Sequence, residues 1–101
     1  MTPTPSNPAE ARDLLARELL HFRAMSYSDL QKLMGSPQVV ERSGASGISY
    51  TVEIEVFWDS PHDPGGDLRV IASIDDGRIL SALSPLSSDF IMDPDGKFIG
   101  E

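Results

Sequence analysis

The sequence predicts an α+β fold, with one longer and one short N-terminal helix packed on a meandering antiparallel sheet of about four strands and a short C-terminal hairpin. Apolar residues recur at helical spacing as far as about residue 34. From about residue 38 they alternate with polar residues, as they do in strands that bury one face. Because the helix signals precede the strand signals, the order favours α+β over a parallel α/β sheet.

The first helix is expected over residues 8–23. Asn7 is placed to cap it, Pro8 suits the first helical position, and Glu10 can bond back to the cap. One face of this helix is apolar and is expected to pack on the sheet; it carries Ala11, Leu15, Leu19 and Phe22.

A short second helix is expected over residues 27–34. Ser26 is placed as its cap, and Asp29 completes the pattern of a capping box. Gly35 can adopt the left-handed conformation that ends a helix, and Pro37 prevents its continuation. The apolar stripe of this helix contains Leu30, Leu33 and Met34.

The strongest strand signal is the run ISYTVEIEVFWD, residues 48–59, which follows a first strand in QVVERSG and a turn in SGASG. Alternation divides this run into two faces. The apolar face holds Ile48, Tyr50, Val52, Ile54, Val56 and Trp58, and the polar face holds Ser49, Thr51, Glu53, Glu55 and Asp59 together with Phe57.

The next strand is LRVIASI, residues 68–74, in which Leu68, Val70, Ala72 and Ile74 share one face. The turn signal DDG follows it, and RILSAL, residues 78–83, is expected to return as a strand. FIMDPDGKFIG, residues 90–100, is expected to form two very short strands around the turn at 93–96.

The composition is that of one globular domain, expected over residues 7–101 after a loose tail at 1–6. The chain has no cysteine, which excludes disulfides, thiolate metal sites and a cysteine nucleophile. It has no long apolar run and no secretory signal, so we expect a cytoplasmic protein that does not bind membranes. We also expect no cofactor.

The net charge of −8 is confined to the second half of the chain. Residues 1–50 hold five acidic and five basic residues, whereas residues 51–101 hold eleven acidic and three basic ones. Such a field repels the phosphates of nucleic acids and favours encounter with a basic partner. We therefore expect no binding to nucleic acid, although solubility alone also explains the charge.

The stretch WDSPHDPGGD, residues 58–67, is the densest group of potential metal ligands. Its proline and glycine residues exclude a helix and are typical of a connecting loop. A weak divalent-metal or small-ligand site in this loop is the alternative, because tight metal sites need fixed geometry. Its ligands would be Asp59, His62, Asp63 and Asp67.

Other candidate sites have weaker patterns. The segment DPDG near the C-terminus does not match a calcium loop in either possible register, so it indicates a type I turn with a bulge. Glu53 and Glu55 share the polar face of one strand, where exposed carboxylates are poor catalysts. His21 lies beside the expected core face, which favours a boundary residue over a ligand. We therefore expect no catalytic residues and no enzyme.

Phe57 is the apolar residue on the otherwise polar face of the 48–59 strand. If Ile71 and Leu80 lie on the same side, they form with it an apolar patch bordered by acids. Such patches mark interaction sites.

Two segments of the second half are GGDLRVIASIDDG (65–77) and SPLSSDFIMDPDGKFIGE (84–101), joined by EIEVFWD (53–59). In these segments the chain resembles a family of small bacterial proteins for which no activity is established. The resemblance implies a recurring domain and no catalytic residues. The helix–helix–sheet plan, with DLQKLMGSP leading into a strand, is also similar to that of small bacterial outer-membrane assembly lipoproteins, and this implies architecture only.

These observations favour a small acidic interaction module without catalysis, in which Glu53, Glu55 and Phe57 contact a basic protein partner. An immunity- or inhibitor-like protein that neutralises a basic toxin or nuclease is a sharper form of this hypothesis. The protein is expected to be a monomer or a weak homodimer. The metal-binding loop is the alternative.

Overall fold

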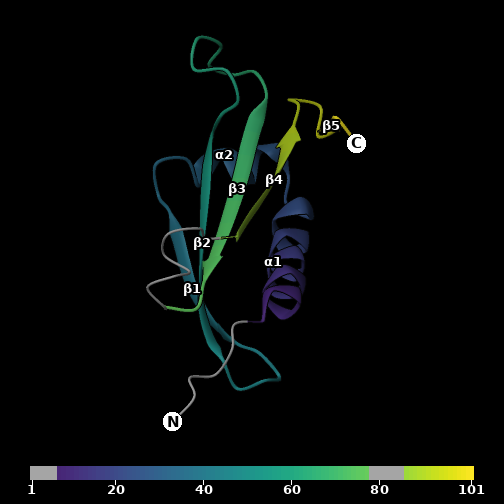
Figure 1. Ribbon diagram of the computed structural model, residues 1–101. Coiled ribbons are helices and arrows are strands. Elements are labelled where there is room, and N and C mark those ends of the chain that lie inside the picture. The colour runs from purple at the N-terminus through teal and green to yellow at the C-terminus, as the bar shows by residue number, and fades with distance from the viewer. Residues whose placement is uncertain (1–6, 78–85) are drawn as a thin grey trace.

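The computed structural model describes residues 7–77 and 86–101 and confirms the α+β class. The two helices lie on one face of a five-stranded antiparallel sheet, whose strand order is the chain order, β1-β2-β3-β4-β5 (Figure 1). The elements are α1 (Pro8–Arg23), α2 (Tyr27–Lys32), β1 (Gln38–Ser43), β2 (Ser49–Trp58), β3 (Leu68–Asp75), β4 (Leu86–Met92) and β5 (Phe98–Ile99). The predicted tail at 1–6 and the predicted strand at 78–83 lie outside the described residues.

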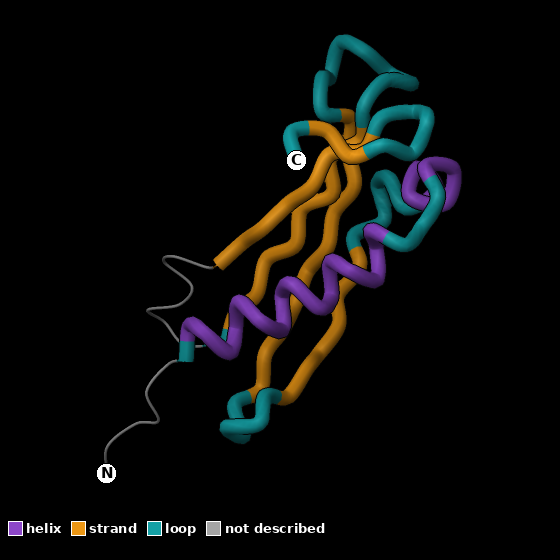
Figure 2. Tube along the Cα trace, turned by 90° about the vertical axis from the view of Figure 1, so that its right-hand side faces the viewer, coloured by secondary structure: helices purple, strands orange, loops and turns teal. Residues whose placement is uncertain are grey.

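Helix α1 has the predicted bounds and runs along the sheet over β3 and β4 (Figure 2). The side chain of Asn7 accepts a hydrogen bond from the backbone N–H of Glu10 at 3.1 Å, as a capping residue does. The predicted return bond from the Glu10 side chain is wrong. That carboxylate turns instead toward the sheet, where Ser46 and Tyr50 donate to it.

Glu10 joins α1 to the hairpin between β1 and β2. Its carboxylate accepts hydrogen bonds from the backbone N–H of Ser46 at 3.0 Å, from the Ser46 hydroxyl at 2.6 Å and from the Tyr50 hydroxyl at 2.8 Å. A Cβ atom added at Gly44 would collide with this carboxylate, so glycine leaves the room that Glu10 needs. The hydrogen bonds from Ser46 and Tyr50 lower the pKa of Glu10.

Helix α2 ends two residues before the predicted end, at Lys32, and the chain then turns through Gly35, whose φ is +78°. The side chain of Ser26 accepts from the N–H of Asp29 at 3.1 Å. The Asp29 carboxylate does not complete the predicted capping box; it lies 3.5 Å from the ammonium of Lys32. Leu30, fully buried, is the residue through which α2 enters the core.

The core lies between the helices and the inner face of the sheet. The predicted alternation is confirmed along β2 and β3, where inner residues are buried and the residues between them are exposed or half-buried. The buried apolar set is Ala11, Leu15, Leu19, Phe22, Leu30, Tyr50, Val52, Ile54, Val56, Leu68, Val70, Ala72, Ile74, Phe90 and Met92.

The C-terminal hairpin extends the sheet beyond the four strands expected. Its first strand, β4, begins at Leu86 and is longer than predicted, and β5 pairs with its end. The connecting turn is as predicted. The N–H of Gly96 donates to the carbonyl oxygen of Asp93 at 2.9 Å, and Gly96 has a φ of +84°.

The end of the chain is attached to the end of α1 by Arg23. The guanidinium of Arg23 lies 4.8 Å from the ring centre of Phe98 and 5.0 Å from that of Phe90. It also pairs with the Glu101 carboxylate at 2.7 Å. Cation–π contacts of this kind favour a fixed arrangement of β4, β5 and α1.

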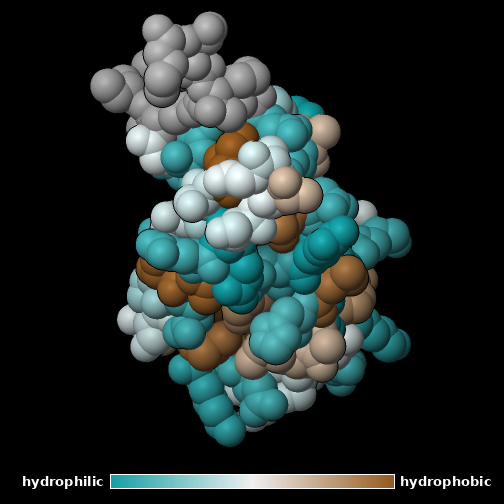
Figure 3. Space-filling view, turned by 90° about the horizontal axis from the view of Figure 1, so that it is seen from below, coloured by the Kyte–Doolittle hydropathy of each residue, from teal (hydrophilic) through white to brown (hydrophobic). Residues whose placement is uncertain are grey.

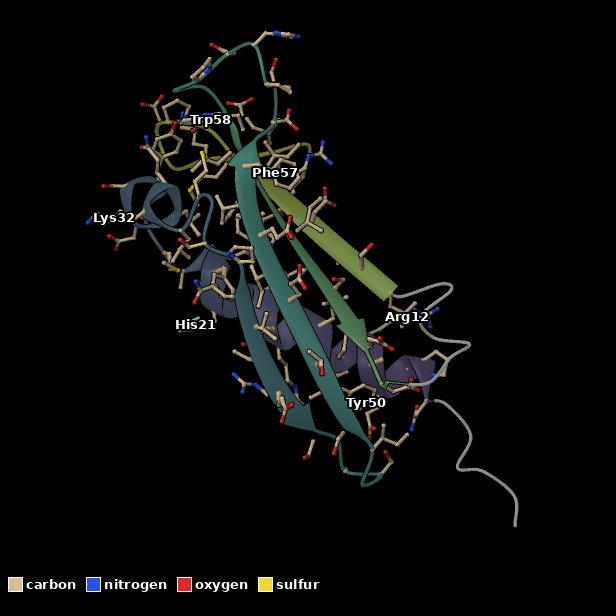
Figure 4. The ribbon with its side chains drawn as sticks, turned by 90° about the vertical axis from the view of Figure 1, so that its left-hand side faces the viewer. Arg12, His21, Lys32, Tyr50, Phe57 and Trp58 are labelled. Carbon is tan, nitrogen blue, oxygen red and sulfur yellow. The ribbon has the colours of Figure 1, made fainter. Side chains whose placement is uncertain are left out.

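The face of the sheet opposite the helices is uncovered in the described structure; it faces the viewer in Figure 4, with Phe57 labelled on β2 and α1 behind the strands. Seen from below, the surface carries apolar side chains as separate patches between hydrophilic ones (Figure 3). None of the described helices is long and apolar enough to cross a membrane.

Candidate functional site

The candidate site is the helix-free face of the sheet, here called the outer face. Sequence analysis assigned Glu53, Glu55 and Phe57 to one face of β2, and strand register places residues of the neighbouring strands beside them. The members that define the site are Val39, Glu53, Glu55, Phe57, Arg69, Ile71, Asp89, Ile91 and Ile99.

An apolar row crosses the outer face at the end near the 59–67 loop. Phe57 pairs with Arg69, Arg69 with Ile91, and Ile91 with Ile99, so the row runs from β2 to β5. Phe57 is 37% exposed and Ile99 is 42% exposed. Ile71 lies on the same face, as expected, while Leu80 lies outside the described residues. The predicted patch is thus described only for Phe57 and Ile71, and Ile91 and Ile99 lie on the same face.

Arg69 stands inside this row and is held by two acids. Its Nε donates to Asp59 at 2.8 Å, and its Nη1 donates to Asp89 at 2.8 Å. The hydrogen bond with Asp59, followed by the nearby charges, raises the pKa of Arg69. Its charge is thus already compensated, and it is the only basic residue among the described strand residues of the outer face.

Glu53 and Glu55 lie one beside the other on β2, next to the apolar row. Neither has a cationic partner among the described residues. A hydrogen bond with Glu53, then partial burial and the charge of Glu53, raises the pKa of Glu55. Sequence analysis treated these two side chains only as exposed carboxylates and did not foresee the hydrogen bond between them. Two adjacent carboxylates of this kind attract an incoming guanidinium or ammonium group.

The 59–67 loop is held by its own backbone and by α2. The N–H of Asp59 donates to the carbonyl of Asp67 at 2.9 Å, and the N–H of Gly66 donates to the carbonyl of Asp63 at 3.0 Å. The Tyr27 hydroxyl donates to the carbonyl of Gly66 at 2.7 Å. Burial, followed by the charges of Asp67 and Asp63, raises the pKa of Tyr27.

The four predicted metal ligands of this loop do not converge. Asp59 points to Arg69, and His62 is exposed. No group of three or more His, Asp or Glu side chains in the described part of the chain could hold a metal ion. Asp59, His62, Asp63 and Asp67 are therefore not arranged around one metal ion. The metal-binding alternative stays a prediction that their arrangement does not support.

Two features of the site escaped sequence analysis. The contribution of Ile91 and Ile99 depends on strand pairing at the C-terminal hairpin, which alternation within one strand does not reveal. The bridging position of Arg69 between Asp59 and Asp89 depends on the same register. Alternation did carry one signal, because Leu68 and Val70 point inward and Arg69 must therefore point outward.

Comparison with protein-family models, with curated proteins and with solved structures found no match to this chain. The resemblance carried by residues 53–59, 65–77 and 84–101 therefore stays an expectation.

Proposed function

We propose that the protein is a small non-catalytic interaction module whose outer face binds a basic protein partner. The observation that carries the proposal is the uncompensated pair Glu53 and Glu55 beside the exposed Phe57. The pair supplies charge, and the apolar side chains of Phe57, Ile71, Ile91 and Ile99 on the same face supply area that a partner can bury.

The folding of the chain gives no reason for this arrangement. A solvated sheet face needs polar residues, but adjacent like charges on a strand repel each other and destabilise it. Phe57 has no helix above it and remains 37% exposed, so part of its ring surface is left for a partner to bury. Both features become favourable when a cation and an apolar group cover them together.

The test compares three forms of the protein as bait in a cell lysate, at low and moderate salt. They are the wild type, the variant Glu53→Gln/Glu55→Gln/Phe57→Ser, and a matched control that changes charge and apolarity equally elsewhere. The control is Asp13→Asn/Asp95→Asn/Leu20→Ser, at exposed positions outside the sheet strands.

The expected result is a basic protein retained by the wild type and by the control but lost by the outer-face variant. The affinity measured with the purified partner should fall with rising salt, because solvent-exposed charges are screened beyond about 8 Å at physiological ionic strength. Retention of the same partner by all three baits, or loss by both variants, would contradict a role for the outer face.

A further inference from the structure

Strand β1 is an open edge of the sheet. It stands first in the strand order, and in an antiparallel pair every second residue directs its N–H and C=O away from its neighbour. The hydrogen bond of 2.9 Å from the N–H of Gly44 to the carbonyl of Ile48 shows that Gly44 directs its backbone groups toward β2. Every second residue before it does the same, so the residues whose backbone groups point outward are Val39, Glu41 and Ser43. The Arg42 side chain agrees, since it reaches the Glu41 carbonyl at 3.0 Å.

This edge has little of the protection that sheet edges usually carry. Residues Gln38–Ser43 contain no proline and no lysine, and their pairing with β2 runs without a bulge. Arg42 occupies one acceptor position of the Glu41 carbonyl, which has a second lone pair. Val39 is 59% exposed, so the strand also presents apolar surface at its edge.

An apolar groove lies directly beneath the edge. Helix α1 packs over β3 and β4, and a space remains between it and the inner side of β1, which the Arg42 side chain crosses to reach Glu18. The resulting space measures about 450 Å³ and lies within the range of binding pockets. Its apolar lining is Phe22, Met25, Leu33 and Val40, with His21 on α1 beside it (Figure 4).

The charged residues of the groove neutralise each other. The Arg42 guanidinium meets the Glu18 carboxylate through two hydrogen bonds, of 3.0 and 3.1 Å. The groove therefore favours apolar side chains. The other side of β1 differs, because Glu41 lies there and Val39 pairs with Glu53 of the acidic pair.

We propose that β1 docks an extended segment of a basic partner, which adds to the sheet as a sixth strand. Its backbone would pair with Val39, Glu41 and Ser43, its alternate apolar side chains would enter the groove, and its basic side chains would face Glu41 and Glu53. A second copy fits the edge less well, since two chains with a net charge of −8 repel each other. The basic character of the segment rests on the proposed function; the edge and the groove do not.

The probe is a nine-residue fluorescent peptide of alternating lysine and valine, and its control has the same composition in blocks. Binding is followed by fluorescence anisotropy for wild type, Val39→Pro and Val39→Thr. Proline at 39 removes the outward N–H that the added strand would use, and it leaves every hydrogen bond to β2 in place. Proline also favours an extended backbone at the residue before it, which a strand already has. We expect the alternating peptide to bind the wild type at least about tenfold more tightly than the block peptide, Val39→Pro to lose this preference, and Val39→Thr to keep it.

Amide hydrogen exchange gives a second readout that needs no variant. On binding, the amides of Val39, Glu41 and Ser43 should gain protection, while those of Gln38, Val40 and Arg42 already pair with β2 and change less. Equal binding of the two peptides, equal binding to Val39→Pro and Val39→Thr, or no added protection in β1 would overturn the inference. So would a homodimer, seen by sedimentation, that Val39→Pro abolishes.

The two proposals can fail separately. If the lysate partner depends on Glu53, Glu55 and Phe57 but binds Val39→Pro unchanged, the outer face is the site and strand addition is wrong. If the alternating peptide protects β1 but no partner depends on the outer face, the edge binds and the proposed function is wrong.

Discussion

The inner and outer faces of β2 differ in burial although their residues alternate along one strand. Val52 and Ile54 are at most 1% exposed beneath the helices, whereas Phe57 on the other face is 37% exposed. The inner face is decided by the core, since burying apolar area is the main favourable term in folding. The outer face has no such constraint, so the presence of an acidic pair and an aromatic ring there needs another explanation.

This difference in burial separates inner-face residues, which stabilise the fold, from outer-face residues, which remain accessible to a partner. Removing atoms from the inner face should destabilise the protein, while changing outer-face residues should alter binding and leave the fold intact. Three comparisons follow, and we order them from the largest expected effect on stability to the smallest.

The largest effect on stability is expected from Ile54→Ala on the inner face, compared with Ile71→Ala on the outer face. Ile54→Ala removes buried atoms at a fully packed position and should lower the free energy of unfolding by about 2–5 kcal/mol. Ile71→Ala, on the half-buried outer face, should cost roughly 1 kcal/mol or less. Urea unfolding followed by circular dichroism measures both. Equal losses would mean that the outer face is also part of a core.

A smaller effect is expected from Glu10→Gln, which removes charge where α1 meets the β1–β2 hairpin. Because hydrogen bonds from Ser46 and Tyr50 lower the folded-state pKa of Glu10 below its ordinary value of about 4.5, its contribution to stability is present above that value. The contribution is lost as pH falls through the lowered folded-state pKa. Wild type should thus exceed Glu10→Gln in stability at neutral pH, and the difference should shrink in acid.

Urea unfolding of both forms at several pH values between about 3 and 7 checks this dependence. Glu41→Gln, an exposed change on β1, serves as the control. A gap between wild type and Glu10→Gln that stays constant with pH would assign the effect to packing instead of charge.

The smallest effect, with the opposite sign, is expected from Glu55→Gln. The pKa of Glu55 is raised by its hydrogen bond with Glu53, so its favourable contribution is present at low pH and is lost as pH rises through the raised folded-state pKa. At neutral pH the two carboxylates repel, and Glu55→Gln should stabilise the protein by a few tenths of a kcal/mol, the size typical of exposed charge pairs. Below about pH 4 the advantage should disappear.

Thermal unfolding at pH 7 and at pH 3.5 checks the sign. A neutral-pH loss of stability in Glu55→Gln would show that the pair supports the fold, and would contradict a role for the pair in binding alone. A stabilised variant that binds the partner less well would place Glu55 among residues kept for function at a cost in stability.

The sequence by itself determined both helices to within two residues, the alternation along β2 and β3, and the core residues other than Phe90 and Met92. Asn7 and Pro8 fix the start of α1, and Gly35 ends the turn after α2, because capping and left-handed conformations are local properties of the chain. Alternation along 48–59 and 68–74 is equally local, and it assigned Val52, Ile54, Leu68 and Val70 to the inside. It also placed Glu53, Glu55 and Phe57 together on one face.

Only the tertiary structure decided what meets across the strands. Register brought Ile91 and Ile99 to the row that begins at Phe57, and it put Arg69 between two acids. Glu10, expected to serve its own helix, binds Ser46 and Tyr50 instead, since the fold carries these donors to it from a distant part of the chain. The groove beside β1 arises where α1 packs on β3 and β4, and the pattern within a helix does not say which strands it will cover.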